Sequence, residues 1–458
     1  MIRKAVWIIG MLLLLAPCVA AQSGEPIEKL PLPVKPPVNL DKPADGAPQL
    51  ILEEPRRTAW FYVEADYLYW WVNHQPAPIL LTTAPNNGLN ANGLTGGILG
   101  QPGTQTLVSG DNLGYPTFSG MRVKAGVNLD SDGFWTVEAS GFMLPKRSIN
   151  LNYGGRSDGT PLLTIPFLDA ASGQPSALDL SAQDANGNPF LLGGVGIHAD
   201  LQTWGYEANV IAHSIRTAER SVDLLVGFRA LSLDENLAIN QTIVPTQDGN
   251  ITVQFPTTGQ GAGSYFFGAA GNPVYVNDFF GTRNQFYGPQ LGTRFRWDLG
   301  RWTADITAKV AVGVTHEQAN IEGSTTATLA TNPNTGASVA NLITPGGMFA
   351  LQNNIGTYSQ NQFTVVPEIG ANLSYAVTSW LHIHAGYSAL YWSNVARPGA
   401  QIDSTLNSKL IPTGALLPTA TSPTGSFVPG SEQGRPYFAF HDTAFWAQGV
   451  SFGVEIRY

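Results

Sequence analysis

Two histidines and one acidic segment are the residues of this sequence whose spacing could support metal chemistry. His382 and His384 are two residues apart, which puts both rings on one face of a strand, where they could hold a metal ion. No third ligand is evident, so two polar side chains without a metal remain the alternative. Residues 128–133 begin like a calcium loop, but Ala139 stands where the bidentate glutamate belongs. Asp and Gly are also expected at a tight turn.

Catalytic patterns are incomplete. His316-Glu317 lacks the second histidine of a zinc protease motif, and no serine lies in a nucleophile elbow. His441-Asp442, at the base of the last strand, is the nearest approach to a hydrolase pair. We therefore expect no enzymatic activity, no cofactor and no metal.

The composition excludes several classes of protein. Only 12% of the 458 residues are charged and the net charge is -9, which argues against nucleic-acid binding. The chain contains 50 Gly, 32 Pro and 11 Trp, and after residue 21 no apolar run approaches the roughly 20 residues of a membrane helix. These features indicate many strands and many turns.

The N-terminal part is predicted to be an export signal followed by a spacer. Residues 1–21 have the basic, apolar and small-residue regions of a signal peptide, with cleavage expected near Ala21. The single cysteine, Cys18, fits lipidation poorly because Pro17 precedes it, so the mature chain is expected to have no thiol. Residues 22–58 form a Pro-rich periplasmic linker, and 59–458 form the folded domain.

From residue 60 onward, apolar and polar residues alternate with a period of two, which predicts strands. The ten predicted strands lie at about 61–71, 121–129, 135–143, 204–210, 222–229, 287–298, 302–314, 363–375, 381–391 and 450–458. Extra hairpins inside a long loop could raise the number to 12.

Four features favour a membrane barrel over a secreted sandwich. The apolar face of each predicted strand carries no charge, as the cost of burying Lys or Arg in lipid requires. Aromatic residues such as Tyr67 and Trp302 end the apolar faces. Long connections (about 72–117, 145–200, 233–283, 317–361 and 393–442) alternate with short turns, and the chain stops on Tyr458. The sequence therefore predicts an all-β, transmembrane, antiparallel up-and-down β-barrel with long extracellular loops.

The polar face of the predicted strands would line the lumen with both signs of charge. Two interpretations remain open: a polar channel lining, or an internal salt-bridge network that plugs a narrow barrel. The predicted lining residues are Glu64, Asp66, Arg122, Lys124, Glu138, Glu207, Asp223, Arg229, Arg294, Arg296, Asp305, Lys309, Glu368, His382, His384, Glu455 and Arg457.

Three segments resemble a known family. They are Ala65-Asp66-Tyr67-Leu68-Tyr69-Trp70-Trp71; Leu390 to Gly399 with Gln401-Ile402-Asp403; and Phe445 to Gly449 with Phe452-Gly453-Val454-Glu455. From about residue 60 to 458 the chain resembles the beta-barrel porin-7-like outer-membrane proteins of planctomycete-type bacteria. The resemblance implies a barrel with a porin-like role and supplies no catalytic residues.

We expect an outer-membrane protein of a Gram-negative-type envelope that lets small polar solutes or ions diffuse passively. The alternatives are a non-conducting barrel that displays its loops for surface binding or adhesion, and an outer-membrane hydrolase. The expected partners are outer-membrane lipid and the barrel assembly machinery, which would read the C-terminal strand ending at Tyr458. No nucleic-acid partner is expected.

Overall fold

The structure is a computed structural model that describes residues 60–85, 96–130, 134–217, 219–254, 265–413 and 434–458. The chain divides into two units, Met1–Arg56 and Arg57–Tyr458, and the described residues belong to the second. The predicted signal peptide (1–21), Cys18 and the linker (22–58) lie outside the described residues. None of the described segments is a helix long and apolar enough to span a bilayer.

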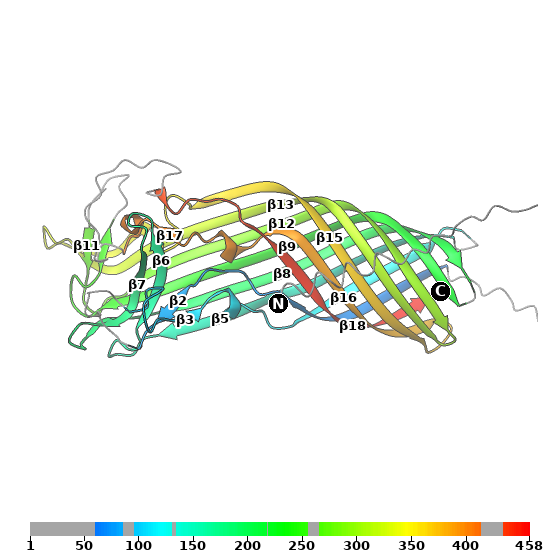
Figure 1. Cartoon of the computed structure of the whole chain (residues 1–458), viewed down its shortest axis with the longest axis horizontal. Coiled ribbons are helices and arrows are strands. Elements are labelled where there is room, and N and C mark those ends of the chain that lie inside the picture. The colour runs from blue at the N-terminus through cyan, green and yellow to red at the C-terminus, as the bar shows by residue number, and fades with distance from the viewer. Residues whose placement is uncertain (1–59, 86–95, 131–133, 218, 255–264, 414–433) are drawn as a thin grey trace, which may run out of the picture. The chain divides into compact units, whose positions relative to one another are not determined.

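Ten antiparallel strands close into a barrel (Figure 1). Each pairs with the next, and the last pairs with the first, so the ring has no open edge. The order is β1 (Phe61–Val72), β4 (Phe118–Asn128), β5 (Trp135–Gly154), β8 (Pro189–Arg216), β9 (Arg220–Pro245), β12 (Val274–Leu299), β13 (Trp302–Thr331), β15 (Gly356–Ala376), β16 (Leu381–Ala396) and β18 (Asp442–Arg457).

Eight shorter strands bring the described total to 18, more than the ten to 12 expected. They lie in the long connections and do not close the ring: β2 (Leu81–Thr83), β3 (Gln105–Val108), β6 (Leu163–Asp169), β7 (Pro175–Gln183), β10 (Thr252–Gln254), β11 (Tyr265–Gly268), β14 (Ser338–Pro345) and β17 (Thr405–Leu406). In the described part of the chain, three short 3-10 helices accompany them: η2 (Gly110–Asn112), η3 (Pro398–Gln401) and η4 (Ser408–Leu410).

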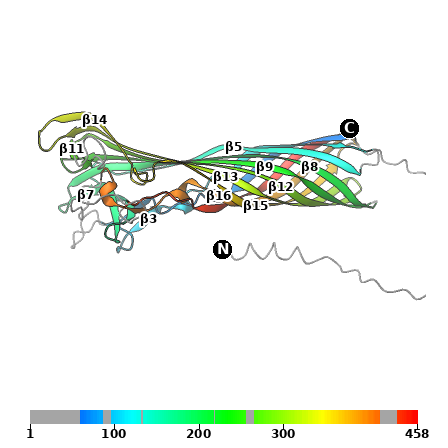
Figure 2. The same cartoon turned by 90° about the horizontal axis from the view of Figure 1, so that it is seen from above.

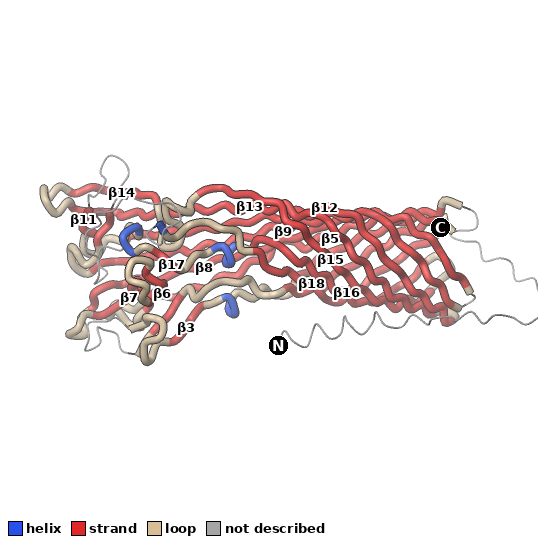
Figure 3. The backbone as a smooth tube through the Cα atoms, turned by 45° about the horizontal axis from the view of Figure 1, so that its top comes forward, coloured by secondary structure: helices blue, strands red, loops and turns tan. Residues whose placement is uncertain are grey.

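The two ends of the barrel differ in how the strands are connected. At one end, the turn end, the barrel strands are joined through 129–134, 217–219, 300–301 and 377–380. Gly300 makes one of these turns with a φ of 69°, a conformation that favours glycine. Trp60 N donates to Tyr458 O at 2.6 Å, so the barrel begins and finishes at this end. The short strands and the longer connections gather at the opposite, loop end (Figure 3).

An apolar band surrounds the barrel toward the turn end. Its outward side chains include Val310, Val312 and Val314 of β13, each exposed on the outer wall. Twelve residue steps separate Trp302 from Val314. At about 3.3 Å per step and a tilt of about 40° they cover roughly 30 Å, close to the height of a membrane-barrel band. The band is therefore the surface that contacts hydrocarbon.

The strands continue well beyond this band, which corrects the predicted loop boundaries. β8 begins at Pro189 and β13 extends to Thr331, inside segments that the sequence pattern assigned to loops. Figure 2 shows these long strands reaching toward the loop end.

The cause of the boundary error is that the polarity of the wall reverses while the side-chain alternation continues. Within the band, Leu224, Val226 and Phe228 of β9 point outward and are exposed. Beyond the band, the outward positions are polar, as Asp234 and Asn236 show, and the inward side chains are apolar and buried: Leu233, Leu237, Ile239 and Ile243. Water replaces hydrocarbon outside, and a packed core replaces the polar lumen inside.

Candidate functional site

The predicted lining side chains lie inside the barrel, where each is buried or half-buried. They are Glu64, Asp66, Arg122, Lys124, Glu138, Glu207, Asp223, Arg229, Arg294, Arg296, Asp305, Lys309, Glu368, His382, His384, Glu455 and Arg457. Most of them are joined in ion pairs, some between neighbouring strands and others between strands that are not neighbours in the ring. The question of an open or filled lumen therefore depends on how these pairs are arranged.

One group of pairs lies toward the turn end. Arg294 Nη2 binds both carboxylate oxygens of Glu138, at 2.9 and 3.1 Å, and the hydroxyl of Tyr62 donates to the same carboxylate. Lys124 Nζ contacts Glu64 at 3.0 and 3.2 Å. In these ion pairs, the positive charges of Arg294 and Lys124 compensate the negative charges of two carboxylates inside the lumen.

A second group lies farther along the lumen. Arg229 is the centre of this group, because its guanidinium contacts both Glu207 and Glu368. Lys309 Nζ binds the same two carboxylates, at 2.6 Å from Glu207 and 3.4 Å from Glu368. Gln290 Nε2 donates to Glu207 at 3.2 Å. Side chains from β8, β9, β12, β13 and β15 therefore meet inside the barrel.

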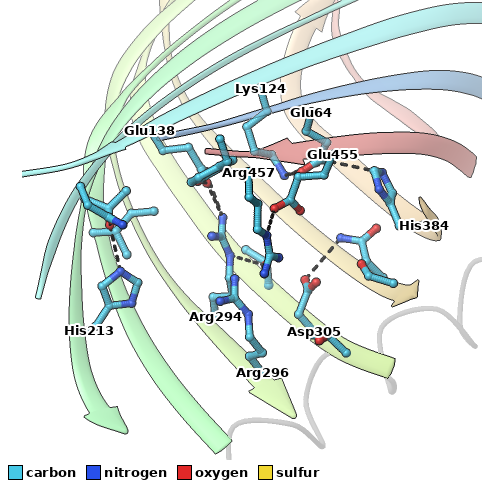
Figure 4. A pocket seen from close by; sticks show the side chains of 18 of the residues that line it. Glu64, Lys124, Glu138, His213, Arg294, Arg296, Asp305, His384, Glu455 and Arg457 are labelled. Atoms are coloured by element: carbon cyan, nitrogen blue, oxygen red, sulfur yellow. Dashed lines mark hydrogen bonds and ion pairs between the residues drawn. The ribbon is translucent and has the colours of Figure 1, made fainter. Parts of the chain in front are cut away.

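Small cavities remain beside these groups. A cavity of about 180 Å³ near the turn end is lined by residues that include Arg296, Asp305 and Arg457 (Figure 4). A cavity of about 60 Å³ lies between Arg122, Arg229 and the apolar side chains Leu231 and Leu390.

An apolar core fills the interior toward the loop end. Wall residues from different sides of the barrel join one buried cluster, among them Leu68, Leu233, Phe286 and Val366. Four connecting segments, together called the plug (73–85, 96–117, 346–355 and 397–413), add residues such as Leu81, Leu113, Phe349 and Leu406 to the same cluster. The alternation pattern did not reveal this core, because plug residues come from connections that contain only very short strands and irregular stretches, without a sustained alternation.

A buried ion pair fastens the plug to the wall. Arg397 and Glu235 are both fully buried; Nε and Nη2 of Arg397 contact the two oxygens of Glu235 at 2.9 and 2.7 Å. Arg397 Nη1 also donates to the carbonyl of His74 at 2.8 Å. In the sequence, Arg397 contributes to the family resemblance, but no pattern there indicates that it is buried or paired.

Other polar contacts hold the plug and the end of β16 that leads into it. Asn284 exchanges two hydrogen bonds of 2.8 Å with the backbone of Ala396. Asp278 accepts from the backbone N–H groups of Met348, Phe349 and Ala350 at 2.9, 2.9 and 2.7 Å. These side chains satisfy backbone groups that would otherwise be buried without partners.

The remaining candidates for chemistry do not assemble into a catalytic site. His441 Nδ1 lies 2.9 Å from the carbonyl of Ala439, whereas Asp442 accepts from Gln360 Nε2 at 3.0 Å. His316 and Glu317 point to opposite faces of β13, since one is half-exposed and the other is fully buried.

The side chains of the two metal-site candidates, residues 128–133 and the pair His382 and His384, also have different partners. Asp130 accepts from the backbone of Phe134 and Trp135 at 2.9 Å, as in a turn, and residues 131–133 lie outside the described residues. His384 contacts Asp66 on β1, and the ring of His382 is not part of that contact.

Among solved structures, the chain is similar to the outer membrane protease OmpT from Escherichia coli, with a TM-score of 0.37 and 7% identity over 87% of this chain and 96% of that one. It is also similar to the CymD monoaromatic hydrocarbon channel (TM-score 0.16, 8% identity, 88% and 89% covered) and to a Pseudomonas aeruginosa FadL homologue (TM-score 0.17, 8% identity, 87% and 89% covered).

No curated protein matches the chain. A family model does: the one described as "Putative beta barrel porin-7 (BBP7)" matches residues 62–458, which is the barrel and its loop end except for the first residue of β1. The chain therefore belongs to this beta-barrel porin-7 family and is an outer-membrane β-barrel protein.

Proposed function

We propose that this outer-membrane barrel is closed in its resting state and acts through the folded surface at its loop end. The observation that carries the proposal is the filled interior. Ion pairs centred on Arg229 occupy the lumen within the apolar band, and the plug forms an apolar core beyond it. A hydrated ion would have to break both to cross.

The loop end supports a role in surface binding or adhesion. Strands such as β13 continue past the hydrocarbon band, and the short strands β6, β7 and β17 pair there. A large folded surface therefore stands outside the membrane. Because both ends of the barrel chain lie at the turn end, we place the turn end in the periplasm and the loop end outside the cell.

Passive diffusion of small polar solutes or ions is the second candidate. The polar cavity of about 180 Å³ near the turn end favours it, because that cavity would form the inner half of a channel if the plug moved. In this case the plug would act as a gate.

Conductance in planar bilayers separates the two candidates. We expect a silent membrane at a protein density that a gel shift between unboiled and boiled samples verifies as folded barrel. The matched control is a chain carrying Arg397→Ala and Glu235→Ala, which loosens the plug, and current from this variant would show that insertion was adequate. Steady current from the unaltered chain would overturn the closed-barrel proposal and support diffusion.

The proposal includes no enzymatic activity, because His441 and Asp442 contact different partners. Peptide or lipid-ester hydrolysis by the purified barrel that is lost on His441→Ala would contradict it. The proposed partners are outer-membrane lipid around the apolar band and the barrel assembly machinery, which would recognise β18 and its terminal aromatic residue, Tyr458.

A further inference from the structure

Three side chains from two strands that are not neighbours meet inside the barrel near the turn end. Asp66 of β1 and His384 of β16 stand in one row, with Gly453 of β18 between them. His384 Nε2 lies 2.5 Å from Asp66 Oδ1 and 3.5 Å from Glu64 Oε1. One ligand atom from each of these three residues lies within 4.8 Å of the others.

Glycine at position 453 is what allows this meeting. A Cβ atom there would lie 2.2 Å from Asp66 Oδ1 and 2.6 Å from His384 Nε2, closer than real Cβ atoms approach. β18 separates β1 from β16, so a side chain at this position would keep the two groups apart. Because position 453 has no side chain, the carboxylate of Asp66 and the imidazole of His384 can reach each other across β18.

We propose that Glu64, Asp66 and His384 bind one divalent first-row transition-metal ion, with Zn²⁺ as the type case. One imidazole nitrogen and two carboxylate oxygens form a three-ligand set that suits such ions, and water would complete the coordination. Glu64 and His384 also line the 180 Å³ cavity near the turn end, which supplies a route for the ion (Figure 4). This inference does not depend on whether the barrel conducts.

Two internal cations compete for the same carboxylates, and the geometry limits that competition. Arg122 Nε binds Asp66 Oδ2 at 2.8 Å and leaves Oδ1 to the site. Lys124 binds both oxygens of Glu64 and has to move before Glu64 can bind the ion. The ion replaces the direct contact between Asp66 and His384. Because a ligating imidazole has to be unprotonated, binding weakens at low pH.

Titration of the full, untagged chain in detergent micelles tests the proposal, with Zn²⁺ followed by calorimetry and Co²⁺ by its visible absorption. We expect one ion per chain. His384→Gln should weaken binding at least tenfold, whereas His382→Gln, two residues away on the same strand and also facing the lumen, should leave it unchanged. Lys124→Met should strengthen binding because it removes the competing ammonium.

Gly453→Ala tests the role of position 453 directly. We expect loss of the ion site, whereas Gly370→Ala should retain it, because a Cβ at position 370 meets nothing closer than 3.7 Å. A gel shift on boiling verifies that each variant is folded. The proposal is overturned if neither the unaltered chain nor Lys124→Met binds either ion, or if binding persists in folded His384→Gln.

Discussion

Replacing Arg397 should destabilise the plug strongly, because its charge partner would be left alone in a dry interior. Arg397 and Glu235 are both 0% exposed and share two hydrogen bonds, and a third joins Arg397 to the His74 carbonyl. Removing one partner of a buried pair costs about 3–5 kcal/mol. We therefore expect Arg397→Met to lower the free energy of unfolding by that amount.

The double variant separates charge from shape. Replacing a buried pair by apolar residues of similar size is often nearly neutral. Arg397→Met combined with Glu235→Leu should therefore recover most of the loss and remain within about 2 kcal/mol of the unaltered chain. Arg435→Met is the matched control in the same connection: its 2.8 Å pair with Asp403 is partly exposed, and such pairs contribute about 0–1 kcal/mol.

Urea unfolding of chains folded in micelles, followed by tryptophan fluorescence, measures these differences. With slopes of about 1–3 kcal/mol/M, the single variant should unfold at a urea concentration at least about 1 M lower. Buried Trp392, in the same core, reports on the plug. A single variant within 1 kcal/mol of the unaltered chain, or a double variant as unstable as the single one, would refute the reasoning.

Two further predictions concern the membrane boundary and pH. Val310→Lys places a charge in the middle of the apolar band and should cost about 2–4 kcal/mol, whereas Gln318→Lys, on the same outward face beyond the band, should cost less than about 0.5 kcal/mol. If unfolding in vesicles shows the same loss of stability for both variants, the edge of the hydrocarbon band does not lie between positions 310 and 318. Burial raises the pKa of Asp179, in β7 outside the band, to about 7 from 3.8. The folded chain then holds a proton that the unfolded chain has lost between about pH 4 and 7, so stability falls as pH rises through this window. The urea midpoint should drop from pH 5 to pH 8, and Asp179→Asn should remove that drop; an equal drop in the variant would show that another group is responsible.

The barrel was predictable because the solvent outside it leaves a local signal. Hydrocarbon tolerates no charge on its side of a strand, so Val310, Val312 and Val314 alternate with polar residues in a pattern that can be read from neighbouring positions alone. The same pattern placed Glu207 and Arg229 on the lumen side. It could not show that these two residues share a site with Lys309, because pairing across three strands depends on register.

The plug left no such local signal. Beyond the band, the wall strands bury the opposite face, and their partners come from connections without a fixed period. Leu406 and Phe349 belong to one core although 57 positions separate them. Arg397 stands in a segment whose pattern suggested family membership and nothing about burial.

Sequence alone thus determined the closed sheet, its hydrocarbon-facing rows and the sign of each lumen charge, since these depend on residues one or two positions apart. Only the tertiary structure decided that the interior is filled, that Arg397 meets Glu235 and that Asp66 meets His384 across Gly453. Such meetings depend on how strands distant in sequence align around the ring, and a one-residue change in register would separate them.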